Sequence, residues 1–242
     1  MKISVAMATY NGEKHLLDQI NSIVKQLGPD DEIIICDDGS VDNTIKIIEN
    51  LMYKEKRISL FENKHKGVVK NFEDAIRRCK NDIILLSDQD DIWETVKVTQ
   101  IKNYFENTDK SLVLHNAIIF FEDQLDSNKE LISNMHHGTY SNIYKSSYWG
   151  CCMAFKQELR KYILPFPDNL IAHDQWIGLI AESRKESEFI NAKLIKHRIH
   201  KDNVSNKLSL NKKIHFRLNL LIRYLKYKSS LRKSSLKQGE AN

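Results

Sequence analysis

Three carboxylates stand within four positions of the segment ILLSDQDD, where Asp88, Asp90 and Asp91 follow a hydrophobic run. Like charges this close repel one another, and either a bound cation or plain exposure to solvent would relieve the repulsion. Carboxylate oxygens are suitable ligands for Mg²⁺ or Mn²⁺, and such an ion could bridge to the phosphates of a nucleotide. The cluster therefore indicates either a metal site or a solvated loop.

Two more polar clusters, TYNG and DDGS, follow apolar runs nearer the N-terminus. In the first, Thr9, Tyr10 and Asn11 offer a hydroxyl, an aromatic ring and an amide, which together can hold a base and a ribose. In the second, Asp37 or Asp38 can accept a hydrogen bond from a base N–H or a ribose hydroxyl. Each cluster alone is ordinary turn chemistry. Their joint placement after predicted strands favours a nucleotide site.

The elements that must position these clusters are read from hydrophobic periodicity. Strands are predicted at 3–8, 32–38, 58–63 and 82–88, and helices at 13–26, 42–52 and 68–79. This alternation, with short connections, predicts an α/β fold with a mostly parallel central sheet and helices on both faces. Ligands bind outside the carboxyl ends of such strands, so the three clusters are expected at one edge of the sheet.

The second half of the chain is less regular. Helices are predicted at 95–107, 158–163 and 173–183, strands at 111–121 and 149–155, and no structure is assigned to the polar stretch 122–147. No internal repeat or low-complexity linker is visible. We therefore expect one domain over residues 1–205 and a separate extension over residues 206–242.

Composition and motifs narrow the function class. The 41% hydrophobic and 29% charged residues are typical of a soluble globular protein. No signal peptide is recognised, and no apolar run approaches the roughly 20 residues needed to span a bilayer. The four cysteines have no CxxC spacing, which predicts a reduced cytosolic protein without structural zinc. The sequence contains neither the dinucleotide-binding motif GxGxxG nor the P-loop motif GxxxxGK[ST]. A dinucleotide-binding protein and a kinase-type enzyme are therefore disfavoured.

Basic residues concentrate in the extension. Residues 201–242 carry a formal charge of about +9, while residues 1–200 carry about −4. An apolar stripe at helical spacing runs through the basic residues: Ile214, Leu218, Leu221, Ile222 and Leu225. This pattern fits a basic amphipathic helix on an anionic membrane surface, or one packed on the domain with solvated lysines. Nucleic-acid binding is not indicated, and the final segment KSSLRKSSLKQGEAN is predicted to be disordered.

Four segments resemble the successive motifs of the family 2 glycosyltransferases, which have the GT-A fold: VAMATYNGEKHL, IIICDDGSVDNT, NKHKGVVKNFEDAI and ILLSDQDDIW. The resemblance covers roughly residues 1–205 and points to the bacterial branch with rhamnosyltransferases of cell-surface polysaccharide assembly. It implies an inverting enzyme that uses Mn²⁺ or Mg²⁺. The donor would be a UDP- or dTDP-sugar carrying a hexose or deoxyhexose, and the acceptor a growing or lipid-diphosphate-linked glycan at the cytoplasmic face of the plasma membrane.

The resemblance also implies roles for the polar clusters. Thr9, Tyr10, Asn11 and Asp38 would line the nucleotide site. Asp88 and Asp90 would be the DxD pair, with Asp90 the direct metal ligand. Asp91 lies outside this pair and is expected to cap a helix that begins near Trp93.

Later segments match the acceptor side and a late motif of the same family. WGCCMAF and HDQW resemble its small-residue loop and the acidic residue before a helix, so Asp174 would be the general base. HRIHKDNVS resembles an Arg-x-His-x-x-Asn motif, which would bring Arg198 to the diphosphate and make His200 a metal ligand. One departure is His173, because many relatives carry an acidic pair at this point.

Two other functions compete with this reading. A sugar-1-phosphate nucleotidyltransferase could be built on a similar sheet, but TYNGEKH does not supply the Gly-rich, Arg-containing loop of that class. A non-catalytic, membrane-attached nucleotide-sugar binder would not require Asp38, Asp90 and Asp174 together.

Overall fold

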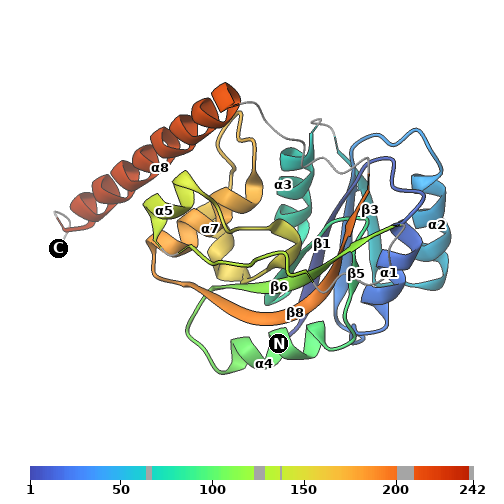
Figure 1. The fold of residues 1–242 in the computed structure, drawn as a ribbon. Coiled ribbons are helices and arrows are strands. Elements are labelled where there is room, and N and C mark those ends of the chain that lie inside the picture. Colours follow the sequence, from blue (N-terminus) through green and yellow to red (C-terminus); the bar gives the residue numbers. More distant parts are fainter. Residues whose placement is uncertain (64–66, 123–128, 137, 201–209, 240–242) are drawn as a thin grey trace.

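A computed structural model describes residues 1–63, 67–122, 129–136, 138–200 and 210–239 of the chain. It contains one eight-stranded sheet with the strand order β3-β2-β1-β4-β7-β6-β8-β5 (Figure 1). The GT-A-like α/β architecture expected from the sequence is confirmed. The predicted boundary between domain and extension falls within residues 201–209, which lie outside the described ranges.

The first half of the sheet is parallel, as predicted. It consists of β1 (Ile3–Thr9), β2 (Glu32–Asp37), β3 (Ile58–Glu62) and β4 (Ile83–Ser87). The strands β1 and β4 are buried along their whole length, which explains their near-continuous apolar sequences. The helices between them are α1 (Leu16–Val24), α2 (Thr44–Lys54) and α3 (Val68–Arg78).

The second half of the sheet is mixed. The strand β7 (Met153–Lys156) runs antiparallel between β4 and β6 (Leu112–Phe121), and β8 (Ser187–Ile199) pairs parallel with β6. A two-residue strand, β5 (Ile92–Trp93), forms the edge beside β8. Neither β5 nor β8 was predicted. The predicted strand at 149–155 begins only at Met153, because residues 150–152 form a 3₁₀ turn.

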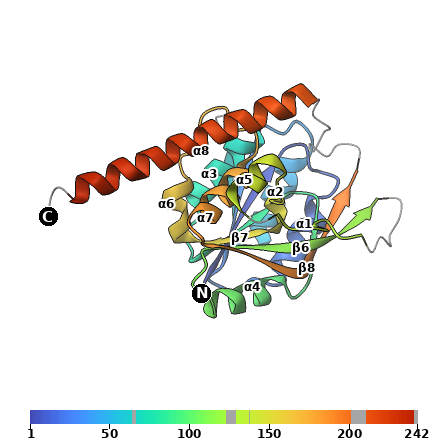
Figure 2. The same cartoon turned by 60° about the vertical axis from the view of Figure 1, so that its left-hand side comes forward.

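Helices cover both faces of the sheet (Figures 1 and 2). The helices α3 and α7 (His173–Ser183) contact each other on one face. On the other face, the segment just after α1 is linked to α4 (Lys97–Glu106) by a 3.2 Å hydrogen bond from the Val98 N–H to Gln26 Oε1. The short helices α5 (Thr139–Tyr144) and α6 (Arg160–Ile163) lie near α7.

The C-terminal helix α8 (Leu210–Gly239) lies across α5 and α7, and its far end extends away from the rest of the molecule (Figure 2). It is longer than the predicted stripe and continues through residues 228–239, where the sequence predicted disorder. No proline or glycine interrupts this stretch before Gly239, so the local sequence permits a helix. No helix within the described ranges is both long enough and apolar enough to cross a membrane.

Candidate active site

The three polar clusters meet at one edge of the sheet, as expected. Thr9 ends β1, Asp37 ends β2 and Ser87 ends β4. Because β1 lies between the other two strands, Thr9 pairs with Asp37 and the nearby Met7 pairs with Ser87. The side chain of Gln89 joins the first and third clusters by bonding the Tyr10 N–H at 2.9 Å and the Tyr10 carbonyl at 3.0 Å.

Asp37 holds the turn that follows β2. Its buried carboxylate accepts hydrogen bonds from the hydroxyls of Thr9 and Ser40 at 2.7 and 2.6 Å, and from the N–H groups of Gly39 and Ser40 at 3.0 and 2.7 Å. Gly39 has a φ of +82°, which favours glycine. Asp37 therefore lies where a nucleotide contact was predicted, but both of its oxygens are already engaged within the protein.

Asp38 has one carboxylate oxygen available. Its Oδ2 accepts the Gly67 N–H at 2.8 Å, whereas its Oδ1 is buried with no hydrogen-bond donor among the described residues. A buried acceptor without a donor is costly, and a ligand N–H or O–H would satisfy it. Nearby, Tyr10 is 54% exposed, and the Asn11 side chain accepts the Val41 N–H at 2.9 Å. Asp38 and Tyr10 are thus positioned to receive a polar ligand.

The carboxylates after β4 lie in an environment that disfavours their charge. Burial, followed by the nearby charges of Asp91 and Asp90, raises the pKa of Asp88 to about 8. Burial and then Asp91 also raise the pKa of Asp90, although its contact with His200 opposes this. A cation bound here would stabilise both ionised carboxylates. The donor chemistry therefore fits Mg²⁺ or Mn²⁺.

The end of β8 brings the late motif to this cluster. His200 Nε2 lies 2.9 Å from Asp90 Oδ2, and the Arg198 side chain donates from Nε to the Asp90 carbonyl at 2.9 Å. The Arg198 guanidinium also lies 4.7 Å from the centre of the Phe120 ring. The structure thus brings together Asp90 and His200, two of the three predicted metal ligands, with Arg198, although more than 100 residues separate Asp90 from the other two in the sequence.

Asp91 acts differently from the prediction. It does not begin a helix, because β5 follows it. Its Oδ1 instead lies 2.8 Å from His197 Nδ1 and accepts the Arg198 N–H at 3.1 Å. Burial alone would lower the pKa of His197, but the hydrogen bond to Asp91 raises it overall. Asp91 and His197 thus connect β8 to the loop that carries Asp88 and Asp90.

Other buried side chains behind the cluster were missed by sequence reasoning. Lys97 is fully buried, lies 3.9 Å from the centre of the Trp93 ring and donates to the Cys151 carbonyl at 3.2 Å. Burial lowers its pKa to about 8. Asp91, Cys151 and His197 also place potential ligand atoms within 4.8 Å of one another. Through the 2.8 Å hydrogen bond between Asp91 and His197, this trio joins β8 to the loop that carries Asp88 and Asp90.

Asp174 approaches the same site from the first turn of α7. Its Oδ1 accepts the Gln175 N–H at 2.8 Å, and burial raises its pKa to about 6. Its charge contributes to the raised pKa of Asp88, so the two carboxylates interact electrostatically. A carboxylate of this kind is ionised near neutral pH and still basic enough to accept a proton.

Gly150 allows the start of α7 to pack closely. A Cβ atom at this position would lie 2.9 Å from His173 Nε2 and 3.7 Å from Asp174 Cβ. The His173 ring stacks on Phe72 with a centroid separation of 4.1 Å, and burial lowers its pKa to about 3. His173 is therefore a neutral packing residue at the start of α7.

A mostly parallel sheet whose strand ends carry paired carboxylates, with a partly buried acid beside them, is typical of the GT-A glycosyltransferases. The family model for Glycosyl transferase family 2 matches residues 4–164. The chain belongs to this family, in its bacterial rhamnosyltransferase-like branch, and is a glycosyltransferase enzyme.

Similar proteins agree with this assignment. The chain is 30% identical over 216 residues to the dTDP-rhamnosyl transferase RfbG of Shigella flexneri, covering 81% of this chain and 72% of the relative. It is 27% identical over 220 residues to the UDP-Glc:alpha-D-GlcNAc-diphosphoundecaprenol beta-1,3-glucosyltransferase WfgD of Escherichia coli, covering 84% and 79%. The structure of Staphylococcus aureus TarS 1–349 in complex with UDP-GlcNAc has the same fold, with a TM-score of 0.72 at 19% identity and coverage of 92% and 66%.

Proposed function

We propose that this enzyme transfers a hexose or deoxyhexose, such as rhamnose, from a UDP- or dTDP-sugar to a lipid-linked or growing cell-surface polysaccharide. The convergence of Asp90, His200 and Asp174 on one edge of the sheet carries the proposal. Similarity to a dTDP-rhamnosyl transferase and to a glucosyltransferase named for a diphosphoundecaprenol acceptor supports the donor and acceptor classes.

A divalent ion fits the donor groups around Asp90. Asp90 and His200 would hold Mn²⁺ or Mg²⁺, with Asp88 beside them. When bound, the ion would neutralise charge on the departing nucleoside diphosphate. The raised pKa values of Asp88 and Asp90 support this assignment, because a cation would relieve the repulsion that causes part of them.

The remaining residues of the edge would bind the nucleotide. Asp38 would accept a hydrogen bond from the base or ribose at its unsatisfied Oδ1, and the exposed Tyr10 ring would pack against the nucleoside. Thr9 and Asp37 would hold the loop in shape through their mutual hydrogen bond. Arg198 would lie near the diphosphate, because it is bound to the backbone of Asp90.

Asp174 would act as the general base. Its carboxylate would take the proton from the acceptor hydroxyl while that oxygen forms a bond to the anomeric carbon. The bond between this carbon and the diphosphate oxygen would break in the same step, so the anomeric configuration would invert. A pKa of about 6 leaves Asp174 mostly ionised at pH 7, as this role requires.

The helix α8 would place the enzyme on the inner face of the plasma membrane. Ile214, Leu218, Ile222 and Leu225 are 47%, 54%, 49% and 48% exposed, so an apolar stripe faces outward. Basic residues border this stripe, as expected for a helix that lies on an anionic membrane surface. An acceptor carried by a lipid would then be presented at the same surface.

Release of nucleoside diphosphate tests the proposed reaction. Purified enzyme is incubated with UDP-glucose or dTDP-rhamnose and a lipid-diphosphate-linked sugar, with Mn²⁺ or with EDTA. We expect metal- and acceptor-dependent release, and a loss of about 10²- to 10⁴-fold in Asp174→Asn. Release that is unchanged in Asp174→Asn would contradict the role of this residue.

The earlier alternatives lose support. Membership of the glycosyltransferase family argues against a sugar-1-phosphate nucleotidyltransferase and against a purely binding role.

A further inference from the structure

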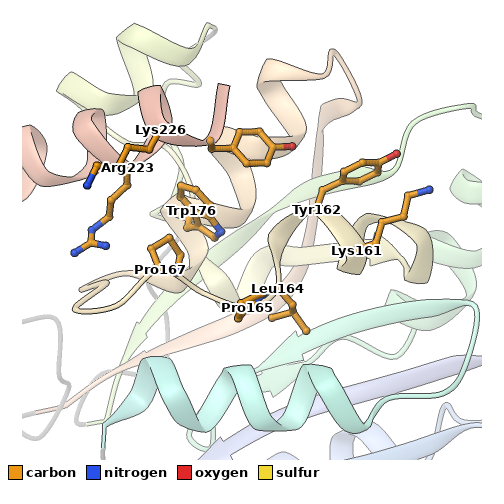
Figure 3. A pocket seen from close by; sticks show the side chains of 9 residues that line it. Lys161, Tyr162, Leu164, Pro165, Pro167, Trp176, Arg223 and Lys226 are labelled. Atoms are coloured by element: carbon orange, nitrogen blue, oxygen red, sulfur yellow. The ribbon is translucent and has the colours of Figure 1, made fainter. Parts of the chain in front are cut away.

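A groove of about 460 Å³ lies between α8 and the segment that links α6 to α7 (Figure 3). Its floor is apolar and aromatic, with Pro165, Pro167 and Trp176 among its residues. Basic side chains stand at its two ends: Arg223 and Lys226 come from α8, and Lys161 comes from α6. A surface of this kind combines a place for an anion with a place for an apolar chain.

The walls of the groove are fixed by contacts within the protein. Trp176 donates from Nε1 to the Ile163 carbonyl at 3.0 Å, and its ring meets the edge of Tyr227 on α8 with a centroid separation of 5.9 Å. On the opposite side, the Arg184 guanidinium lies 3.5 Å from the centre of the Tyr162 ring. The groove is therefore built jointly by α8 and the catalytic domain.

The basic side chains of the groove have no acidic partners in the described part of the chain. No ion pair there includes Lys161, Arg223 or Lys226. Arg184, close to the groove, is by contrast paired with Glu186 at 2.7 Å. The positive charge at the α8 end is thus available to an external anion.

We propose that the groove binds the phosphate end of a lipid, with the phosphate held by Arg223 and Lys226 and the first part of an apolar chain on the floor beside Trp176. Arg223 and Lys226 adjoin Ile222 and Leu225 of the exposed stripe, so the groove opens beside the surface proposed to face the membrane. That the bound phosphate belongs to a lipid rests on the proposed function. That Arg223 and Lys226 bind a phosphate does not.

Soluble short-chain lipids test the groove without a membrane. Metal-free full-length protein is titrated calorimetrically with dihexanoyl phosphatidylglycerol below its micelle concentration, with inorganic pyrophosphate, and with glycerol as a neutral probe. We expect Arg223→Gln and Lys226→Gln each to weaken lipid binding about fivefold, the effect expected for one basic residue near an anionic surface. The matched control is Lys228→Gln, an exposed residue of the same helix outside the groove, which should leave binding unchanged.

The two probes distinguish the source of the phosphate. Binding of the lipid at least tenfold tighter than pyrophosphate supports a lipid ligand. Equal binding of both, still lost in Arg223→Gln, would overturn the role of the apolar floor and leave a site for free phosphate. Unchanged lipid binding in the double variant of Arg223 and Lys226, or a loss confined to Lys161→Gln, would overturn the assigned phosphate end.

Nucleotide binding separates this proposal from the proposed function. Arg223→Gln and Lys226→Gln should bind nucleoside diphosphates like the unmodified enzyme, because the groove residues are not among those at the strand ends. If the unmodified enzyme bound no nucleotide, the proposed function would be contradicted. The measured binding of lipid in the groove would not be affected.

Discussion

Asp174 combines partial burial with charge, and this combination has a measurable cost at the scale of a single residue. Its ordinary pKa of 3.8 is raised to about 6, which makes the ionised form unfavourable in the folded protein by about 3 kcal/mol at most. The protein keeps this side chain although it weakens the fold. Such a conflict is typical of a residue retained for chemistry.

The stability of Asp174→Asn should therefore depend on pH. The folded protein binds the proton more tightly than the unfolded chain, so the penalty is absent below pH 3.8, grows between 3.8 and 6, and is complete above 6. We expect the variant to be more stable than the unmodified enzyme by about 1–3 kcal/mol at pH 8. At pH 3 the difference should be near zero. Urea unfolding at both pH values measures it, and an equal difference at both would contradict the raised pKa.

Individual residues differed in how far the sequence could predict them. Asp90, His200 and Asp174 meet as the family resemblance implied, because their motifs survive as short recognisable segments. Lys97, Cys151 and His197 were missed, since their contacts join residues far apart in the chain and no local pattern marks them. Lys97 lies inside the helix predicted at 95–107, but nothing in that segment marked it as buried.

At the scale of the element, the two adjacent carboxylates at the end of β2 have different roles, one in structure and one in binding. Asp37 has both oxygens engaged within the turn, whereas Asp38 has one unsatisfied oxygen. We expect Asp37→Asn to lower the free energy of unfolding by about 2–3 kcal/mol, because an amide nitrogen would face existing donors. Asp38→Asn should change stability little but weaken nucleotide binding about tenfold. Urea unfolding and calorimetry separate the two effects, and identical behaviour of the two variants would contradict this division.

The turn before β7 controls the position of α7. Gly150→Ala would place a methyl group 2.9 Å from His173 Nε2, and His173 is already held against Phe72. We expect a shift at the start of α7 that lowers kcat at least tenfold and leaves nucleotide binding within about twofold. The matched control is Gly28→Ala, whose new Cβ would meet Asp31 Oδ2 at 3.4 Å, just before the end of β2 that lies opposite Asp37. Steady-state kinetics measure kcat for both variants. Equal kcat values would contradict the proposed role of Gly150 in positioning α7.

At the same scale, the elements of the first half were predictable and several of the second half were not. Strands β1, β2 and β4 are apolar and almost wholly buried, so their sequences carry a clear signal. The strand β8 is partly exposed and contains Lys193, Lys196 and His197, which hides its periodicity. The 3₁₀ turn at 150–152 contains the apolar residues Cys151 and Cys152, which are buried. Its sequence is therefore hard to distinguish from the start of the strand that follows it.

At the scale of the whole molecule, an apolar stripe lies outside the core along α8. The helix α8 buries Leu220 and Tyr224 against the domain, while Leu218 and Leu225 face outward. Sequence reasoning left membrane binding and packing on the domain as alternatives. The structure shows packing through one face of the helix, and it leaves the other face available for the proposed membrane contact.

Replacing outward leucines should separate membrane binding from stability. We expect the double variant Leu218→Ser and Leu225→Ser to lose at least tenfold in sedimentation with phosphatidylglycerol vesicles, with a change of less than about 0.5 kcal/mol in unfolding free energy. Leu220→Ser, on the packed face, should instead lower the unfolding free energy by about 2–4 kcal/mol. Vesicle binding that survives loss of both outward leucines would contradict the proposed membrane surface.

The central claim is a metal-dependent nucleotide site at the ends of β1, β2 and β4. Calorimetric titration of the purified enzyme with UDP, dTDP and GDP, each with Mn²⁺ and with EDTA, tests it most directly. We predict that UDP or dTDP binds at least tenfold more tightly with Mn²⁺, and that this gain disappears in Asp90→Ala while the fold is retained. Binding of none of the three nucleotides under either condition, or a gain that persists in Asp90→Ala, would contradict the account.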